Sequence, residues 1–331
     1  MEQRIAANYA ASLEKCLEGL GVSHFLQRSE FDISRLQDPE SFISMEEFSI
    51  LIRSAFHLTH CPWLGLTFGK SLSIVNHGFL GYAAMSSPTM GTAIHTMLRY
   101  INTRTSVLRM QMYTRNELVC VELDVLWDTP DIQRFFVEMA VVHLLNMRGF
   151  LIQTKEPCPL IQIAYAPPDY AMKYREFLNT GAIEFEADSH RVWFATKELD
   201  YPISFADDSS YQLAKSQLQA IVTQLSTKAD LASRIKTILI NNDLQYLSME
   251  EIARQVCMSS RTMRRHLQKE NLTYQELVDE VRFEKAKAYL LHQRMTQGEI
   301  SFLLGFQDVS NFVKAFKRWT GMTPGEYRER L

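Results

Sequence analysis

The chain has 331 residues, of which 46% are hydrophobic and 22% charged, and its formal net charge is -3. This composition can fill packed cores, which excludes a generally disordered chain, and the length predicts about two domains. The N-terminus carries charges throughout, and no apolar run is long enough to span a bilayer, so we expect a cytoplasmic protein without a signal peptide or a membrane partner.

Charge is distributed unevenly along the chain. Ala232 to Leu331 contains 16 Lys and Arg against 12 Asp and Glu, a net charge of +4, which leaves -7 for the residues before it. A basic end joined to an acidic body is typical of a nucleic-acid module attached to a domain of another kind.

The odd number of five cysteines and the absence of C-x-x-C spacing predict reduced thiols rather than disulfides or a zinc site.

The first 70 residues are predicted to be helices with short connections. Ser44 to Glu47 has the S-x-x-E spacing of a capping box, and Phe48, Leu51 and Ile52 follow at helical period. Another helix is predicted from about Pro88 to Asn102, because proline is well placed near a helix start.

The middle of the chain changes period. Alternation over 107–113 and 118–126 predicts two strands joined by a turn, and Thr129 followed by Pro130 predicts the capped start of a helix of about 20 residues. A strand at 160–164, a helix at 170–178 and a final strand pair, 183–185 with 192–194, complete this part. We therefore predict an α+β first domain over residues 1–205, with a small sheet backed by helices.

A helix over 206–230 is predicted to link this domain to the rest. It carries an apolar stripe formed by Leu218, Ile221, Val222 and Leu225. The stripe either pairs two subunits or packs on its own domain.

Residues 231–331 are predicted to be all α, with two helix-turn-helix units joined by a long helix at Leu272 to Leu291. Asp230 is the expected cap of the first helix. In the first helix-turn-helix, Ser248 to Glu251 is another S-x-x-E box, the turn lies at Cys257 to Ser259, and Ser259 caps the second helix. The outward residues of that helix are Ser260, Arg261, Thr262, Arg264, Arg265 and Gln268.

The second helix-turn-helix has its turn at Gly305, and a helix with an apolar stripe follows. The stripe consists of Val309, Phe312, Val313 and Phe316, and the other side carries Ser310, Asn311, Lys314, Lys317 and Arg318. Such a face donates hydrogen bonds to base edges and places cations at phosphates. A connecting helix of roughly 27 to 30 Å approaches the roughly 34 Å repeat of duplex DNA, so one chain can place both helices in successive major grooves.

The sequence runs S-M-E-E-I-A, S-S-R-T-M-R-R-H-L, R-F-E-K-A-K-A-Y-L-L, I-S-F-L-L-G-F and G-M-T-P-G-E-Y-R resemble the AraC/XylS family of bacterial transcription regulators, across roughly Leu231 to Arg330. The resemblance implies a DNA-binding regulator with base-facing positions at Arg261, Thr262, Arg264, Arg265, Val309, Ser310, Asn311 and Lys314. RNA polymerase is an expected partner. Cys257 stands where a helix-turn-helix often has glycine.

The front half is similar to the arabinose-binding-like N-terminal domain of ornithine-utilisation-type regulators of the same family. The matching runs are H-G-F-L-G-Y-A-A-M-S-S-P-T-M-G and L-D-Y-P-I-S-F-A-D. The resemblance implies an effector-binding and dimerisation domain, an activator and a homodimer. His77, Phe79 and Tyr82 are the candidate effector-binding residues.

Other functions have weaker support. His57, His60 and Cys61 are the one cluster of metal-ligand types, and without a fourth ligand we interpret them as structural or surface residues, so neither a metal nor a cofactor is expected. No catalytic motif is present, so the chain is not expected to be an enzyme, although an enzymatic front domain is a third alternative. The main rival is a front domain that only dimerises or docks a protein, without a small-molecule effector.

Overall fold

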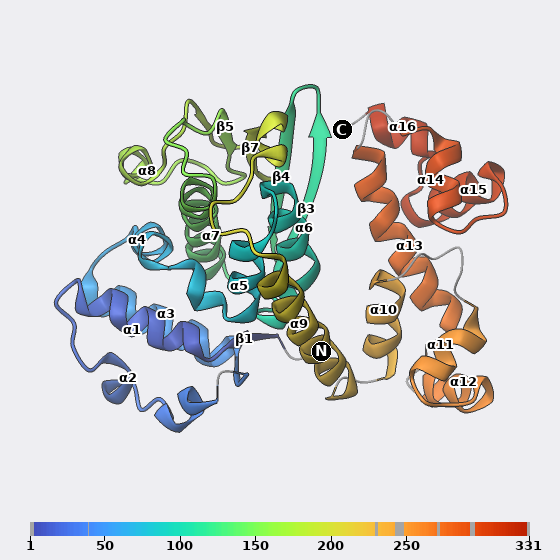
Figure 1. Cartoon of the computed structure of the whole chain (residues 1–331), viewed down its shortest axis with the longest axis horizontal. Helices are drawn as coiled ribbons and strands as arrows, with labels where there is room; N and C mark the ends of the chain where they lie inside the picture. Colours follow the sequence, from blue (N-terminus) through green and yellow to red (C-terminus); the bar gives the residue numbers. More distant parts are fainter. Residues whose placement is uncertain are drawn as a thin grey trace. The chain divides into compact units, whose positions relative to one another are not determined.

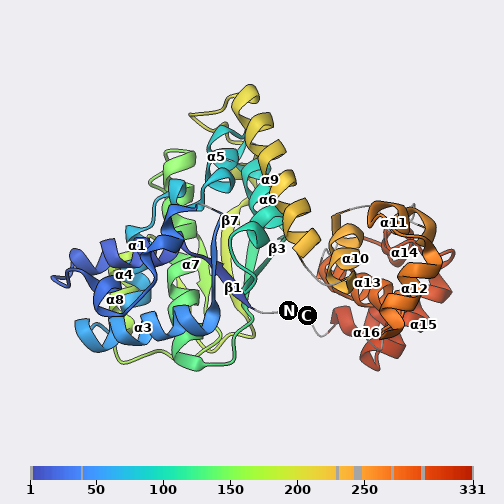
Figure 2. The same cartoon turned by 90° about the horizontal axis from the view of Figure 1, so that it is seen from below.

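The chain folds into two units, each with its own buried core. The computed structural model describes residues 3–38, 40–228, 231–241, 248–269, 272–291 and 295–329. The division falls between Val222 and Thr223. The first unit mixes helices and strands, and the described residues of the second form helices and short connections, as Figures 1 and 2 show. This confirms the predicted α+β domain followed by an all-α domain.

The first unit contains strands, α-helices and short 3-10 helices (η). In chain order they are β1 (Arg4–Ala6), α1 (Asn8–Glu18), α2 (Phe25–Arg28), η1 (Ile33–Gln37), β2 (Phe42–Ser44), α3 (Met45–Thr59), α4 (Leu64–Ser71), η2 (Ile74–His77), α5 (Phe79–Ser86), α6 (Met90–Tyr100), η3 (Ile101–Thr103), β3 (Leu108–Arg115), β4 (Leu118–Val125), α7 (Pro130–Leu151), β5 (Leu160–Gln162), α8 (Ala171–Phe177), β6 (Ile183–Glu184), β7 (His190–Ala195), η4 (Thr196–Asp200) and α9 (Asp208–Lys228).

The main sheet has five strands in the order β3-β4-β7-β5-β6. The predicted hairpin is confirmed: β3 and β4 pair antiparallel, and Asn116, with φ 55°, supplies the left-handed turn residue that this connection needs. The predicted pairing of the last two strands is wrong, because β5 lies between them and pairs with both β6 and β7.

A second, two-stranded sheet was not predicted. β1 and β2 pair antiparallel, with Ile5 opposite Ile43, so the first 70 residues are not helices alone. Both strands are three residues long, which is too short for a clear alternating pattern. The helix that follows β2 begins as predicted, with Ser44 and Glu47 forming a capping box.

The long helix α7 lies between the sheet and the helices α1 and α4 in both views (Figures 1 and 2). Two glycines, one turn apart on α4, allow the close contact with α7: a Cβ on Gly65 would lie 2.7 Å from the carbonyl oxygen of Phe135, and one on Gly69 would lie 2.5 Å from that of Met139. As predicted, Thr129 is the N-cap residue of α7 and Pro130 begins the helix, although the side chain of Thr129 makes no capping hydrogen bond.

Helix α9 packs on the first unit through one side. Ala214 and Leu218 are buried in the core of this unit, and Val222 packs against it. Of the two alternatives for this stripe, the structure shows packing within the chain at Leu218. The linker that we predicted for 206–230 is thus a helix whose first part is anchored to the first unit.

The second unit repeats one arrangement twice. Its helices are α10 (Leu231–Asn241), α11 (Met249–Gln255), α12 (Ser260–Lys269), α13 (Tyr274–Leu291), α14 (Gln297–Leu303), α15 (Val309–Thr320) and α16 (Pro324–Glu329). The connecting helix α13 begins at Tyr274, because Thr273 caps it by accepting a 3.2 Å hydrogen bond from the backbone N–H of Glu276. The predicted cap Asp230 lies outside the described residues.

Within the described ranges, the structure contains no helix that combines the length and the apolar character needed to cross a membrane.

Candidate functional site

Two helix pairs in the second unit, α11 with α12 and α14 with α15, begin in the same way. Ser248 and Glu251 form a capping box before α11, and Thr296 and Glu299 form one before α14. In each box the hydroxyl accepts from the third backbone N–H while the glutamate accepts from the cap residue. These reciprocal bonds satisfy helix N-terminal donors, so each first helix starts at a defined residue.

The turn of each pair needs a left-handed residue. Cys257 has φ 59° and Gly305 has φ 71°. Each turn is closed by a backbone hydrogen bond, from Met258 to the carbonyl of Ala253 (2.9 Å) and from Phe306 to that of Ser301 (3.0 Å). The strain of a left-handed side chain explains why glycine suits this position, and the exposed Cys257 bears this strain in the first helix pair, α11 with α12.

The outward helix of each pair is capped and packed by equivalent residues. Ser259 accepts a 3.1 Å hydrogen bond from the N–H of Thr262 before α12, and Asp308 accepts a 2.7 Å bond from the N–H of Asn311 before α15. Inward residues fix the rotation of both helices about their axes. These are Met263 and Leu267 on α12, and Phe312 and Phe316 on α15, each 0% exposed.

The structure leaves the predicted DNA-contacting side chains at the surface of these two helices. On α12, Ser260 and Thr262 are half-buried, and Arg261, Arg264, Arg265 and Gln268 are exposed. On α15, Val309, Ser310, Asn311, Lys314, Lys317 and Arg318 are exposed. The prediction that Val309 belongs to the buried stripe is wrong: it is 39% exposed because it is the first residue of the helix.

Four of these side chains already have partners within the chain. The hydroxyl of Thr262 lies 2.9 Å from that of Ser259. Arg318 forms an ion pair with Asp279 of α13. The side-chain amide of Asn311 donates to Asp308 at 2.9 Å, and Arg264 lies 3.3 Å from the sulfur of Met249. These contacts orient the side chains before any ligand arrives.

Two arginines that no sequence pattern predicted hold the turns of the two helix pairs in place by hydrogen bonds. Arg282 of α13 donates to the carbonyls of Leu304 and Gly305, both at 2.8 Å, and lies over the Phe306 ring. Arg234 of α10 donates to the carbonyl of Val256 at 3.3 Å, the equivalent point of the first pair. No spacing rule marks these residues, because each contact joins segments 22 or 23 residues apart.

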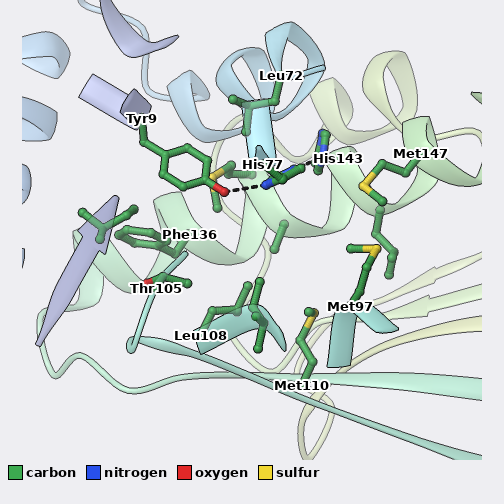
Figure 3. A pocket seen from close by; sticks show the side chains of 15 residues that line it. Tyr9, Leu72, His77, Met97, Thr105, Leu108, Met110, Phe136, His143 and Met147 are labelled. Carbon is green, nitrogen blue, oxygen red and sulfur yellow. Dashed lines mark hydrogen bonds between the residues drawn. The ribbon is translucent and has the colours of Figure 1, made fainter. Parts of the chain in front are cut away.

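The first unit contains a partly open cavity of about 50 Å3, with side chains from α1, η2, α6, β3 and α7 among its lining. Four methionines, Met97, Met110, Met139 and Met147, form much of its apolar wall. Figure 3 shows Met97, Met110 and Met147 with Leu108 and Phe136 around a space that has Tyr9, His77 and His143 along one side.

These three polar side chains form a hydrogen-bonded row. The Tyr9 hydroxyl lies 2.5 Å from Nδ1 of His77, and Nε2 of His77 lies 2.6 Å from Nε2 of His143. Burial lowers the pKa of His143 to about 4 and that of His77 well below its ordinary value, where His143 adds to the effect. Both imidazoles are therefore neutral at pH 7, and one of the two facing nitrogens donates to the other.

Of the three candidate effector residues, the structure brings only His77 to this cavity. Phe79 and Tyr82 are 40% and 53% exposed and do not line it. Their part in ligand binding stays a prediction. Tyr9, His143 and the methionines escaped sequence analysis because they come from segments far apart in the chain, and no local pattern joins them.

Comparison with known proteins decides the family. Residues 19–203 match the arabinose-binding domain of AraC transcription regulators, N-terminal, and residues 252–330 match a helix-turn-helix domain. The chain is also 32% identical to the ornithine utilization regulator of Pseudomonas aeruginosa over 97% of its own length and 95% of that protein. The chain belongs to the AraC family of transcription regulators. As a member of this family it is a DNA-binding transcription regulator and not an enzyme.

Two further proteins of lower identity are similar to this chain over much of its length. The HTH-type transcriptional regulator VqsM of Pseudomonas aeruginosa is 24% identical over 80% of this chain and 83% of that protein. The crystal structure of the transcriptional regulator CdpR from the same organism covers 95% of this chain and 97% of its own, with 21% identity and a TM-score of 0.47.

This AraC-family chain has a second hollow in its first unit, a more open cleft of about 350 Å3 between α3 and α7. Its walls carry charge of both signs, including Arg53 and Asp131, which form a 3.1 Å ion pair, and Arg134 and Glu138. Glu138 is 1% exposed and accepts hydrogen bonds from Tyr170 (2.8 Å) and Tyr174 (2.7 Å). Burial raises the pKa of Glu138 to about 7, against the opposing effect of these hydroxyls.

The candidate metal residues do not assemble a site. His57 and His60 face each other with ring centroids 6.1 Å apart, and Cys61 is buried. In the part of the chain that the structure describes, no group of three or more His, Cys, Asp or Glu side chains converges on a point that could hold a metal.

Proposed function

We propose that this regulator activates transcription in response to a small organic molecule bound in its first unit. The observation that carries the proposal is the partly open apolar cavity with its buried row of Tyr9, His77 and His143. Buried polar groups without a structural task are costly, and an apolar cavity with a few polar groups is the usual form of a small-molecule site.

The DNA contacts that we propose lie on α12 and α15. One half-site is contacted by α12 through the exposed Arg261, Arg264, Arg265 and Gln268, with Ser260 and Thr262 beside them. The other half-site is contacted by α15 through Val309, Ser310, Asn311 and Lys314. Phosphates are contacted by Lys317 and Arg318. The support is the shared capping and packing of the two helices, which turns these side chains outward in both helix pairs of the second unit.

The partners that we propose are double-stranded operator DNA, RNA polymerase, the effector and a second copy of the chain. Leu218 is buried in its own unit, so a dimer contact at α9 would use the opposite side of this helix, where Leu213 is exposed. The name of the P. aeruginosa relative concerns ornithine utilisation, which adds amino acids to the effectors worth testing here.

The experiment that tests the effector is thermal unfolding of the full chain with amino acids, sugars, fatty acids and aromatic acids. A true effector at about 100 times its dissociation constant adds roughly 2.7 kcal/mol to the stability of the state that binds it. Compounds that stabilise the chain are then added to binding titrations with an operator selected from random duplexes. A changed operator affinity supports the proposal, whereas unchanged affinity with every stabilising compound favours the rival, a first unit that only dimerises or docks a protein.

A further inference from the structure

The partly open cavity restricts the chemistry of its ligand more closely than the proposed function does. Apart from Thr105, its polar lining is the row of Tyr9, His77 and His143, and the rest of the lining is apolar. A charged group placed among the methionines would lose its hydration, which is costly, and the lining includes no Asp, Glu, Lys or Arg that could pair with it there. The cavity therefore disfavours amino acids and other molecules with several charges.

The Tyr9 hydroxyl is a polar group of the row to which a ligand can bond without breaking the row. Both nitrogens of His77 are used, one by Tyr9 and the other by His143. The Tyr9 hydroxyl can donate one hydrogen bond and accept two, so the contact with His77 leaves it capacity in either direction. The guanidinium of Arg104, 4% exposed, lies beside this hydroxyl and adds positive charge at the polar end. A cationic group at this end would be repelled, whereas a neutral hydroxyl can both donate to and accept from Tyr9.

The methionines set the size of the ligand. At about 50 Å3 the cavity is a third of the roughly 150 Å3 that admits benzene in an engineered core. Methionine side chains are unbranched and change rotamer easily, so four of them can move outward for a compact guest. We propose that this cavity binds a compact, uncharged, largely apolar molecule with a single hydroxyl group, which meets Tyr9 while its hydrocarbon part displaces the methionines. This inference rests on the proposed effector control.

A path for the signal leaves the cavity through α6. Met97 lines the cavity, and the preceding residue, Thr96, lies 3.2 Å from the hydroxyl of Tyr211 on α9. Ala214 and Leu218 of α9 are buried in the same core. A guest that pushes Met97 moves the helix on which α9 rests, and α9 continues along the chain past Val222, where the first unit ends. Ligand and operator are thus coupled if binding shifts α9 between two positions.

The test uses probes that share one ring: cyclohexanol, methylcyclohexane and cyclohexylamine, with L-ornithine as the charged comparison. Binding to the full chain is followed by thermal unfolding and calorimetry. Cyclohexanol is expected to bind most tightly, methylcyclohexane more weakly, and the two cationic compounds not at this cavity. Tyr9→Phe removes the hydroxyl and keeps the ring, so it should weaken cyclohexanol about threefold to tenfold and leave methylcyclohexane unchanged.

Two further variants separate the parts of the inference. Ala140→Leu fills the cavity from α7 and should abolish binding of both uncharged rings; if this chain does not fold, the Tyr9→Phe comparison still decides. Thr96→Val removes the hydrogen bond to Tyr211, so cyclohexanol should bind as before while its effect on operator affinity is lost.

The failures are distinguishable. If L-ornithine alone binds and alters operator affinity, and Glu138→Gln in the open cleft weakens it while Tyr9→Phe does not, the cavity inference is wrong and effector control stands. If cyclohexanol binds with the expected dependence on Tyr9 but no compound alters operator affinity, the cavity chemistry is right and effector control is wrong. Binding of the rings that is indifferent to both Tyr9→Phe and Ala140→Leu would overturn the location.

Discussion

At the scale of single residues, Arg265 and Asn311 carry the sharpest expectation for DNA recognition. Both are exposed on the outward helices, and Asn311 is held by Asp308. Arginine and asparagine make bidentate contacts with guanine and adenine, so Arg265→Ala or Asn311→Ala should each cost about 1 to 3 kcal/mol on the selected operator and much less on random duplex.

The matched control is Lys317→Ala on the same helix as Asn311. A lysine at a phosphate should weaken operator and random DNA alike and reduce the salt dependence by about one contact. Titrations by fluorescence anisotropy at several salt concentrations make the comparison. Equal losses on both duplexes for Arg265→Ala or Asn311→Ala would assign those residues to the DNA backbone.

The raised pKa of the buried Glu138 should make the stability of the first unit depend on pH. Its pKa is about 7 in the folded chain and ordinarily 4.5, so between these values the folded state binds a proton that the unfolded state does not. Stability should therefore fall by about 3 kcal/mol as pH rises from 4.5 to 7 and then level off. The charges and hydroxyls facing this carboxyl are Arg134, Tyr170 and Tyr174, with Cys61 nearby.

Glu138→Gln removes this titration while keeping the size of the side chain. Urea unfolding of both chains at intervals from pH 4.5 to 8, followed by tryptophan fluorescence, gives the difference in stability at each pH. We expect the wild-type chain to lose stability relative to the variant across this window. Parallel curves would show that the carboxyl titrates near its ordinary value.

At the scale of elements, the two turns differ in one testable way. Cys257 and Gly305 occupy equivalent left-handed positions. A side chain in this region costs about 1 to 2 kcal/mol, so Gly305→Ala should destabilise the second unit by about that much, whereas Cys257→Gly should change its stability by less than about 1 kcal/mol, since relief of strain is offset by a more flexible unfolded chain. Chemical denaturation of the two variants measures the difference, and a large loss in Cys257→Gly would contradict it.

The anchor at Arg282 is a second property of an element. Arg282→Met should leave two carbonyls at the end of α14 without their donor, at a cost of about 2 kcal/mol or more. Arg282→Lys should recover only part, because an ammonium group lacks the fork that reaches both oxygens. Amide hydrogen exchange in α14 and α15 locates the effect. Unchanged exchange at Gly305 and Phe306 would show that the turn does not depend on Arg282.

At this scale, the sequence predicts a contact when the two residues lie close together along the chain, and it does not when they lie far apart. The capping boxes at Ser44 and Ser248 were predicted because their partners lie three residues away. The insertion of β5 between β6 and β7 was not, since strand pairing depends on contacts far apart in sequence. The same limit hid the cavity, where Tyr9 meets His77 across 68 residues, while the outward faces of α12 and α15 followed from local periodicity.

At the scale of the whole molecule, the connecting helix sets the spacing of the DNA site. α13 has 18 residues and spans roughly 27 Å, which we propose places α12 and α15 in successive major grooves. Inserting five base pairs between the half-sites of the selected operator moves them to opposite faces of the duplex, so one chain should lose one of its two contacts. Footprinting of the altered operator should show protection of a single half-site. Full protection of both would mean that two chains read the site, one half each.

The two reading helices of one chain are not copies of each other. One residue separates the left-handed Cys257 from the capping Ser259, but two separate Gly305 from Asp308. The exposed face of α12 carries arginines, whereas that of α15 carries asparagine and lysine. A DNA site that both helices of one chain contact therefore cannot be a palindrome. Such a site is asymmetric, so it has a direction along the duplex. Reversing its sequence in a promoter turns the bound protein end for end, so the direction in which the site is written decides which neighbouring gene the regulator faces.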